Sequence, residues 1–180
     1  MYNEKLKPIL EDLESKEIEI AGGSVVGMVL STINSLIIYI SNLTFGKKKY
    51  EDVQDKIEEI LKEAEDLKTK SLQAIDKDKE ILEEILKNYK LKKENPEKYQ
   101  EVCKVAVEFC MEVLNIAKET FYLTEKISKY GNKMLSSDFK ICKYYSIASI
   151  KSAIVNVEIN LEQIEDKTYV EKIKSEYEEN

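Results

Sequence analysis

Apolar residues recur every three or four positions along nearly the whole chain, and no segment alternates apolar and polar residues between turn signals. The first pattern is typical of amphipathic α-helices, whereas the second would be typical of half-buried strands. The sequence therefore predicts an all-α fold, a bundle of about five to six helices around a central apolar helix. The expected helices cover residues 3–15, 24–44, 51–92, 96–130, 137–164 and 168–178.

Residues that start or stop helices set these boundaries. Ser24 is expected as the N-cap of the second helix, and Gly46 follows the end of that helix. Asn95-Pro96 separates the third helix from the fourth, because Pro favours the first helical position. The segment 51–92 contains no Gly or Pro, so we expect one continuous long helix there.

The second predicted helix differs from the others because residues 20–46 carry no charged side chain. The segment is long enough to cross a bilayer, so a single membrane span is an alternative. Polar residues within it, and the charged amphipathic helices around it, favour a central bundle helix and no membrane. Left exposed, such a helix would present an apolar patch well over ~400 Å², so we expect the chain to associate with further copies.

Length and charge restrict the possible functions. The 180 residues suit a single domain over 1–180. The net charge of -7 argues against nucleic acid as a partner, because neutralising phosphates needs a basic surface. The chain has no His, and all 28 basic residues are Lys. Histidine triads, imidazole zinc sites and arginine clamps are therefore excluded, and we expect no metal site.

Cysteine use and the N-terminal sequence both indicate a cytoplasmic protein. Cys103, Cys110 and Cys142 form no Cys-x-x-Cys pair, and their odd number is typical of reduced thiols in a core. The first residues of the chain lack the apolar core of a signal peptide. We therefore expect a cytoplasmic location.

One carboxylate interrupts the apolar stripe of the long third helix. Counting from Leu67 in steps of three and four reaches Ser71, Ile75, Asp78 and Leu82. A carboxylate facing a bundle interior is costly unless it is hydrogen-bonded or protonated, and such groups can act as general acids or bases. The alternative is that a kink lets Asp78 reach water.

Asn156 and Asn160 lie one helical turn apart in the fifth predicted helix. An Asn side chain offers a donor and an acceptor together, so this pair could bind the amide edge of a ligand. The two amides could equally join neighbouring helices.

Two helix starts and a lysine run are candidate sites for anions. The turn Gly22-Gly23-Ser24 leaves backbone N–H groups at a helix N-terminus, and Ser137-Asp138 begins another helix. A Gly-Gly-Ser sequence is also common as an ordinary turn and cap. The lysines at 47–49 could bind carboxylates or simply offset the dipole of the helix they follow.

Several of these residues belong to sequence elements that resemble the formiminotransferase-cyclodeaminase C-terminal domain family. That family includes stand-alone cyclodeaminases and methenyltetrahydrofolate cyclohydrolases. The resemblance extends over almost the whole chain. The matching elements, in chain order, are Ala21-Gly22-Gly23-Ser24-Val25, Asn42-Leu43-Thr44-Phe45-Gly46-Lys47-Lys48-Lys49-Tyr50, Asp76-x-Asp78, Gly131-Asn132, Ser137-Asp138 and Asn156-Val157-x-Ile159-Asn160-Leu161.

The resemblance implies an all-helical, dimer-forming enzyme of one-carbon metabolism that acts on folate held between subunits. In the deaminase reaction, 5-formiminotetrahydrofolate closes to methenyltetrahydrofolate and ammonia leaves. The cyclohydrolase reaction interconverts the methenyl and 10-formyl forms with water. Both reactions need proton transfer at a tetrahedral carbon joined to two folate nitrogens. The implied partners are a mono- or polyglutamylated tetrahydrofolate derivative, which is the substrate rather than an added cofactor, and a second copy of the chain.

We place the roles that this resemblance implies on the matching residues. Asp78 and Asp138 are the hypothesised acid–base carboxylates, with Lys48 as a nearby positive charge. The hypothesised substrate-binding residues are the backbone donors of Gly22, Gly23 and Ser24, the pterin-orienting Asn132, Asn156 and Asn160, the tail-binding Lys47 and Lys49, and Asn42 and Tyr50 of the lysine-containing element.

The sequence departs from the family pattern at the glycine turn. The usual Gly-Gly-Gly-Ser is Ala21-Gly22-Gly23-Ser24 here. The helix that follows carries larger residues than usual, Met28, Leu30 and Ile33. These departures motivate an alternative function, a non-catalytic helical homologue that acts as an oligomeric scaffold or a folate-binding protein.

Overall fold

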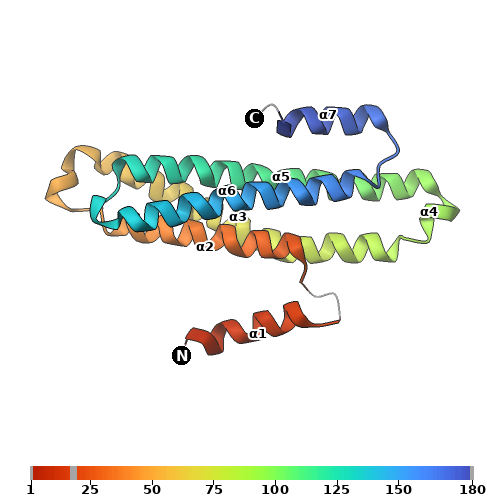
Figure 1. Ribbon diagram of the computed structural model, residues 1–180, viewed down its shortest axis with the longest axis horizontal. Coiled ribbons are helices and arrows are strands. Elements are labelled where there is room, and N and C mark those ends of the chain that lie inside the picture. The colour runs from red at the N-terminus through yellow and green to blue at the C-terminus, as the bar shows by residue number, and fades with distance from the viewer. Residues whose placement is uncertain (1, 17–19, 179–180) are drawn as a thin grey trace.

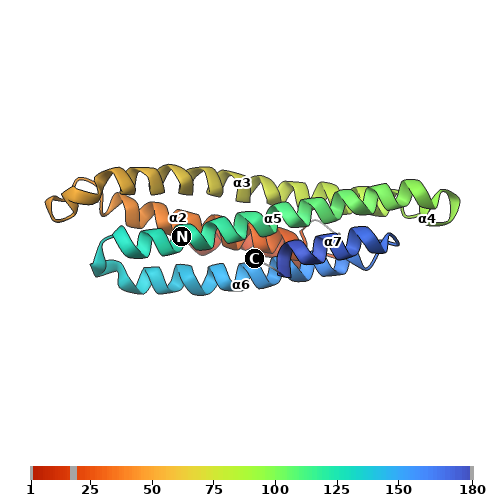
Figure 2. The same cartoon turned by 90° about the horizontal axis from the view of Figure 1, so that it is seen from above.

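The computed structural model describes residues 2–16 and 20–178, which fold into seven α-helices and two short 3-10 helices with no strand among them. The all-α prediction is confirmed. Four long helices run alternately up and down as an antiparallel bundle (Figures 1 and 2). The elements are α1 (Tyr2–Glu14), α2 (Gly22–Asn42), η1 (Lys48–Val53), α3 (Gln54–Lys87), α4 (Leu91–Glu94), α5 (Pro96–Tyr130), η2 (Lys133–Leu135), α6 (Ser136–Leu161) and α7 (Lys167–Glu178).

Helix α2 is the central helix of the bundle, as predicted. It packs against α3, α5 and α6, and Leu30, Ile37 and Ile40 on it are fully buried. Among the described residues it is also the one helix long and apolar enough to cross a membrane. Its packing on three neighbouring helices accounts for this apolar composition within the bundle.

Helix α5 begins and ends where the sequence predicts. The long helix expected over 51–92 is present but shorter, because α3 covers only Gln54–Lys87. The chain there forms η1, then α3, and then the separate short helix α4. Asn88 ends α3: its side-chain amide donates to the Glu84 carbonyl (2.8 Å), and its backbone N–H donates to the same carbonyl. A side chain that binds the backbone in this way stops a helix without any Gly or Pro signal.

The bundle helices differ in length, and this difference positions the N-terminus of α2. Helix α2 has 21 residues, whereas α3 has 34 and α5 has 35. At about 1.5 Å per residue, α2 spans about 32 Å and α3 about 51 Å. The N-terminus of α2 therefore lies part-way along the bundle, and helices α3 and α6 continue past it (Figure 1).

Helix α6 exposes several large apolar residues and buries small ones. Ile141, Tyr145 and Val155 are exposed, whereas the small Ser146 and Ala153 are buried. Both sides of α6 carry apolar residues, so its sequence does not single out one inward face. Small inward residues let the middle of α6 approach its neighbours closely, whereas Phe139, Val157 and Leu161 are buried toward its ends.

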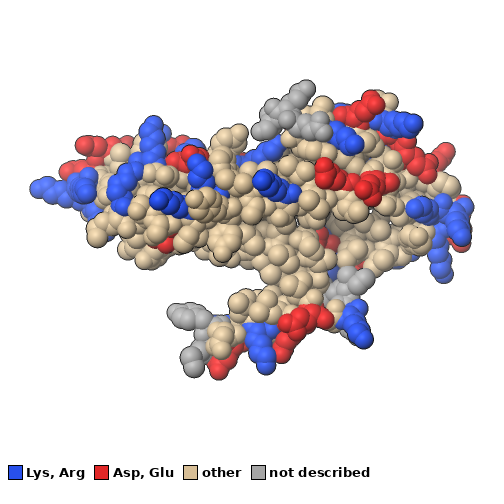
Figure 3. Space-filling view, in the orientation of Figure 1, with Lys and Arg blue, Asp and Glu red and all other residues tan. Residues whose placement is uncertain are grey.

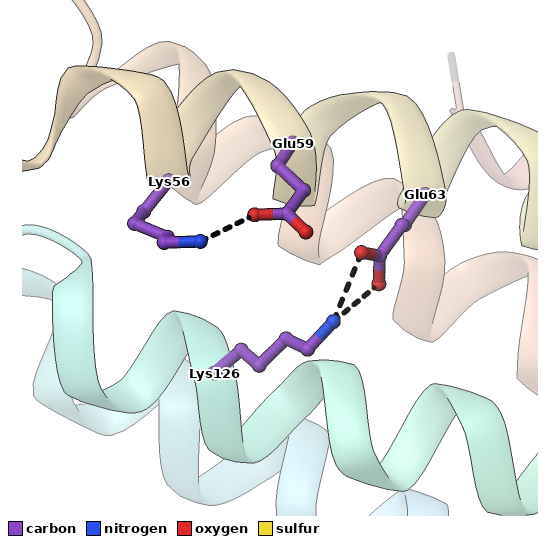
Figure 4. A network of polar contacts seen from close by, with 4 residues as sticks. All are labelled: Lys56, Glu59, Glu63 and Lys126. Atoms are coloured by element: carbon purple, nitrogen blue, oxygen red, sulfur yellow. Dashed lines mark hydrogen bonds and ion pairs between the residues drawn. The ribbon is translucent and has the colours of Figure 1, made fainter.

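Charged residues gather on the α3–α5 side of the bundle. Lys126 of α5 contacts both carboxylate oxygens of Glu63 of α3 (2.9 and 2.8 Å), and Lys56 pairs with Glu59 nearby at 2.9 Å (Figure 4). Exposed pairs of this kind stabilise a fold by at most about 1 kcal/mol each. By contrast, the surface of the bundle that looks toward α1 is mostly uncharged (Figure 3).

Candidate functional site

The N-terminus of α2 is capped by a residue from another helix. Its N-cap is Ala21, not Ser24 as predicted, and Ala has no side chain that can accept a hydrogen bond. Instead, Asp78 of α3 accepts at Oδ2 from both the backbone N–H and the hydroxyl of Ser24, each at 2.8 Å. A carboxylate at a helix N-terminus satisfies a free N–H group and offsets the helix dipole.

Gly23 allows the carboxylate of Asp78 to come this close to the turn. A Cβ atom at position 23 would lie 2.1 Å from Asp78 Oδ1 and 2.6 Å from its Cγ. Both distances are too short for non-bonded atoms. Glycine is therefore required at position 23 for this contact. Because Ser24 contacts Oδ2, the other oxygen, Oδ1, is the one that faces Gly23.

The two asparagines of α6 lie at the same end of α2. The side-chain N–H of Asn160 donates to the Asn156 carbonyl (2.8 Å) and contacts Cys110 Sγ of α5 at 3.4 Å. Asn156 Oδ1 lies 3.8 Å from the Cβ position of Gly22. Burial raises the pKa of Cys110 to about 12, with the charge of Asp78 adding to the effect. Side chains of all four bundle helices thus meet here.

We name this group the turn cluster. Its members are Gly22, Gly23, Ser24, Asp78, Asn156 and Asn160. It combines a positioned carboxylate, two amides and a helix N-terminus, which are groups that can transfer protons and bind the polar edge of a ring. The sequence predicted these residues, but it missed Cys110, whose only signal was its place on the buried face of its helix.

A second polar cluster lies at the opposite end of α2. Asn132 is buried there, and its backbone N–H donates to the Thr44 hydroxyl at 2.9 Å. Its Oδ1 accepts from the Tyr50 hydroxyl at 3.2 Å. The Tyr50 hydroxyl in turn accepts from the Lys133 backbone N–H at 3.0 Å. Gln54 connects the same loop by accepting from the Gly46 N–H and donating to the Tyr50 carbonyl, each at 2.7 Å.

We name this group the loop cluster: Asn42, Lys47, Lys48, Lys49, Tyr50, Asn132 and Asp138. Asp138 is half-buried in the first turn of α6. Burial raises the pKa of Cys142 to about 12, and the charge of Asp138 adds to this effect. The three lysines and Asn42 are exposed. Lys49 Nζ lies 5.8 Å from the centre of the Tyr50 ring. Sequence analysis did not identify Thr44 and Gln54 as residues that hold this loop.

Within one chain, the two clusters are far apart. They lie at the two ends of α2, a separation of about 30 Å. The structure therefore does not bring Asp78 and Asp138 together in a single copy. Lys48 lies at the same end of α2 as Asp138. A shallow groove of about 270 Å³ lies on the α2–α6 surface between the two ends. It is lined by Met28, Val29, Thr32, Ile33, Leu36, Ile141, Cys142 and Tyr145.

A larger hollow of about 650 Å³ lies between α3 and α5. Its lining includes Phe109, Glu112 and Lys70, and none of the residues of the turn and loop clusters. We take the α2–α6 side of the bundle as the candidate site, because both clusters contain residues of these two helices.

The sequence pattern of the family described as formiminotransferase-cyclodeaminase matches residues 5–179, nearly the whole chain. The chain belongs to this family. It is 27% identical over 177 residues to the methenyltetrahydrofolate cyclohydrolase of Methylorubrum extorquens, an alignment that covers 94% of this chain and 85% of that protein. It also resembles the crystal structure of formiminotetrahydrofolate cyclodeaminase from Thermotoga maritima, with a TM-score of 0.91 and 30% identity, covering 97% of this chain and 86% of that one.

The departure from the family's glycine turn leaves the turn cluster geometrically intact. Ala21 has φ -132° and ψ -169°, an extended conformation that any residue adopts without strain. The glycine that the Asp78 contact requires, Gly23, is present. Of the larger helix residues, Leu30 and Ile33 are buried in the core, and Met28 lines the groove.

Proposed function

We propose that this member of the formiminotransferase-cyclodeaminase family is a one-carbon enzyme, a formiminotetrahydrofolate cyclodeaminase or a methenyltetrahydrofolate cyclohydrolase. The names of the two relatives support a folate substrate. The observation that carries the proposal is the contact of Asp78 with Ser24 and Gly23, because it holds a carboxylate at a helix N-terminus beside two amides.

The proposed role of Asp78 is to transfer the proton that both reactions require. The two bonds from Ser24 hold Oδ2, so we assign the transfer to Oδ1, the oxygen beside the Gly23 turn. In the closing direction it accepts a proton from the attacking folate nitrogen. A second group then protonates the departing ammonia or water. Proton transfer by a positioned side chain contributes about 10²–10⁴ in rate.

We propose that the second group comes from another copy of the chain. Two copies paired antiparallel through their α2–α6 surfaces would bring the loop cluster of one to the turn cluster of the other. Such a two-fold pair forms two identical sites. In each site Asp138 and Lys48 of one chain would face Asp78 of the other, with Asn132, Asn156 and Asn160 orienting the pterin.

The lysines of the loop cluster are proposed to bind the glutamate tail of the folate. Lys47 and Lys49 are exposed at the end of the central helix, where a carboxylate can approach them. The protein carries a net charge of -7, so an anionic substrate needs such a local positive patch. A cytoplasmic location is part of the proposal and fits the free, buried cysteines.

The proposal is tested by measuring methenyltetrahydrofolate absorbance with each substrate in turn. Wild-type protein should turn over at least one substrate, and Asp78→Asn should lose activity by about 10²-fold or more while keeping its helical content. Asp66→Asn is the matched control, because Asp66 lies on the same helix with an exposed side chain. Equal activity of Asp78→Asn and wild type would contradict the proposal.

The departures at Ala21 and Met28 motivated the alternative, a non-catalytic scaffold or folate-binding protein. A thermal-shift titration with each folate separates these functions. Saturable stabilisation without turnover would support a binding protein, and neither turnover nor a shift would support a scaffold. The extended backbone at Ala21 favours the enzyme, because the turn needs no third glycine at this position.

A further inference from the structure

Helix α1 carries an apolar stripe that no other described part of the chain covers. Leu6, Ile9, Leu10 and Leu13 follow the i, i+3, i+4, i+7 spacing of one helix face, yet between 38% and 52% of each side chain is exposed. Every side chain described from 3 to 16 is exposed. Helix α7 is of similar length but buries Ile173 and Tyr177 against the core. Figure 1 shows α1 standing apart from the bundle.

A helix like α1 needs an apolar partner in order to persist in water. It has 13 residues, and isolated helices below about 12–15 residues are marginal even with favourable sequences. Pro8 lies inside it, where it removes a backbone hydrogen bond. Its stability must therefore come from packing of the leucine-rich stripe.

The bundle has an uncovered apolar surface of matching character, which we name the apolar face. It comprises the exposed sides of α2 and α6, the groove between them and the loops at one end of both helices. Its large exposed residues are Tyr39, Phe45, Met134, Ile141, Tyr144, Tyr145, Ile147, Val155 and Ile159. In Figure 3 the surface of the bundle turned toward α1 is largely free of charge, with open space between the two.

The size of the apolar face fits a second copy better than the chain's own α1. Its nine large side chains are exposed by 36% or more, which amounts to on the order of 800 Å². One side of a stable protein interface buries about 800 Å². The four side chains of the α1 stripe would cover only part of this area, so α1 folding back alone would leave the rest wet.

We propose that α1 is an exchanged arm: in a pair of identical chains, the stripe of each α1 packs on the bundle of the other copy while the two apolar faces meet. A two-fold pair covers both uncovered surfaces of each chain at once. This inference relies on the proposed function only for the pairing of the α2–α6 surfaces. Because α1 ends at Glu14 and α2 begins at Gly22, the arm and the turn cluster are close in sequence, so docking of the arm would also restrain the turn cluster.

Cross-linking of the unmodified protein tests the exchange. Equal amounts of ¹⁵N-labelled and unlabelled chain are unfolded together, refolded and treated with an amine cross-linker. Lys5 and Lys7 on α1 and Lys140, Lys143 and Lys151 on α6 provide reactive groups. Exchange predicts α1–α6 peptide pairs in which one peptide is labelled and the other is not. Pairs with matching isotopes only, or no α1–α6 pair, would overturn the proposal.

A variant pair measures the contribution of the stripe. Leu6→Gln with Leu10→Gln should weaken self-association by at least about tenfold in sedimentation equilibrium. Leu72→Gln with Leu86→Gln is the matched control, because these α3 leucines are similarly exposed but lie outside α1 and the apolar face. Equal association of the two variants would count against the arm. Neither experiment measures turnover, so failure of the enzyme proposal and failure of this one are distinguishable.

Discussion

The position of Asp78 in the helical stripe left open an inward-facing functional carboxylate or one that reaches water. It is half-buried and hydrogen-bonded, so it does not simply escape to water. It completes the N-terminus of α2, where Ala21 cannot cap, and the same contact leaves one oxygen toward Gly23. A structural cap and a candidate general base are therefore the same carboxylate, which is why substitutions that separate the two roles are informative.

At the scale of single residues, Gly23→Ala tests how closely Asp78 must approach the turn. The new Cβ would overlap Oδ1, so the carboxylate must move and the cap is lost. We expect a loss of about 1–3 kcal/mol in the free energy of unfolding, measured with urea, and a fall in turnover. Gly22→Ala is the stability control, because its nearest atom lies at 3.8 Å, an ordinary contact. Equal stability of the two variants would contradict the geometry.

The buried thiols give a prediction for alkaline pH. Burial raises the pKa of Cys110 and Cys142 from 9.0 to about 12, so the folded chain keeps both protonated where the unfolded chain ionises them. Their stabilisation is complete below about pH 9 and is lost as pH rises through about 12. The free energy of unfolding should fall across this range by about 1.4 kcal/mol per pH unit for each thiol.

Urea unfolding at a series of pH values measures this slope. Cys142→Ala removes one of the two thiols, so its slope should be shallower than that of wild type by the share of one proton. The comparison of slopes is independent of any packing cost of the substitution. Identical slopes would show that Cys142 ionises equally in the folded and unfolded chains.

At the scale of elements, the sequence predicted helices wherever a strong local signal marks a boundary. Asn95-Pro96 and Gly131 enclose α5, and its limits match. The end of α3 was missed because Asn88 stops the helix through a side-chain contact that no Gly or Pro announces. Ser24 lies two residues inside α2 because a distant carboxylate, not the local sequence, provides the cap. Contacts between helices cannot be inferred from local sequence alone.

The face of α6 shows a second limit of sequence interpretation. Apolar periodicity identifies a face that avoids water, but it does not say whether the same chain or another copy covers that face. Ile141 and Val155 are on the surface, whereas Ser146 and Ser149 are inside. The predicted site shows a related limit: its residues were predicted one by one from local features, but their distribution over two ends follows from the length of α2.

The loop between α2 and α3 supports a prediction about the folate tail. Lys47→Ala with Lys49→Ala should raise KM for a polyglutamylated substrate more than for the monoglutamate, because only the longer tail offers several carboxylates. Added salt should reduce the difference, since exposed charges are screened beyond about 8–10 Å. Lys90→Ala with Lys93→Ala at the far end of the bundle is the control. Equal effects on the two substrates would argue against the lysine patch.

At the scale of the whole molecule, one copy separates the two proposed half-sites and, among the described residues, leaves the α1 stripe and the apolar face exposed. The turn and loop clusters lie about 30 Å apart along α2, too far for one folate ring system to contact both within a single chain. The proposed pairing would join the half-sites and cover the apolar face. Activity is then expected only of the assembled protein and should decline with dilution below the dissociation constant of the pair.

Mixing two inactive variants tests whether Asp78 of one chain and Asp138 of another form one site. Asp78→Asn and Asp138→Asn chains, each inactive alone, are unfolded together and refolded, and methenyltetrahydrofolate turnover is measured. Half of the random pairs are mixed, and one of the two sites in each mixed pair contains both carboxylates. We therefore expect recovery to about one quarter of wild-type activity. If the mixture remains as inactive as either variant alone, the two carboxylates do not meet between chains and the account is wrong.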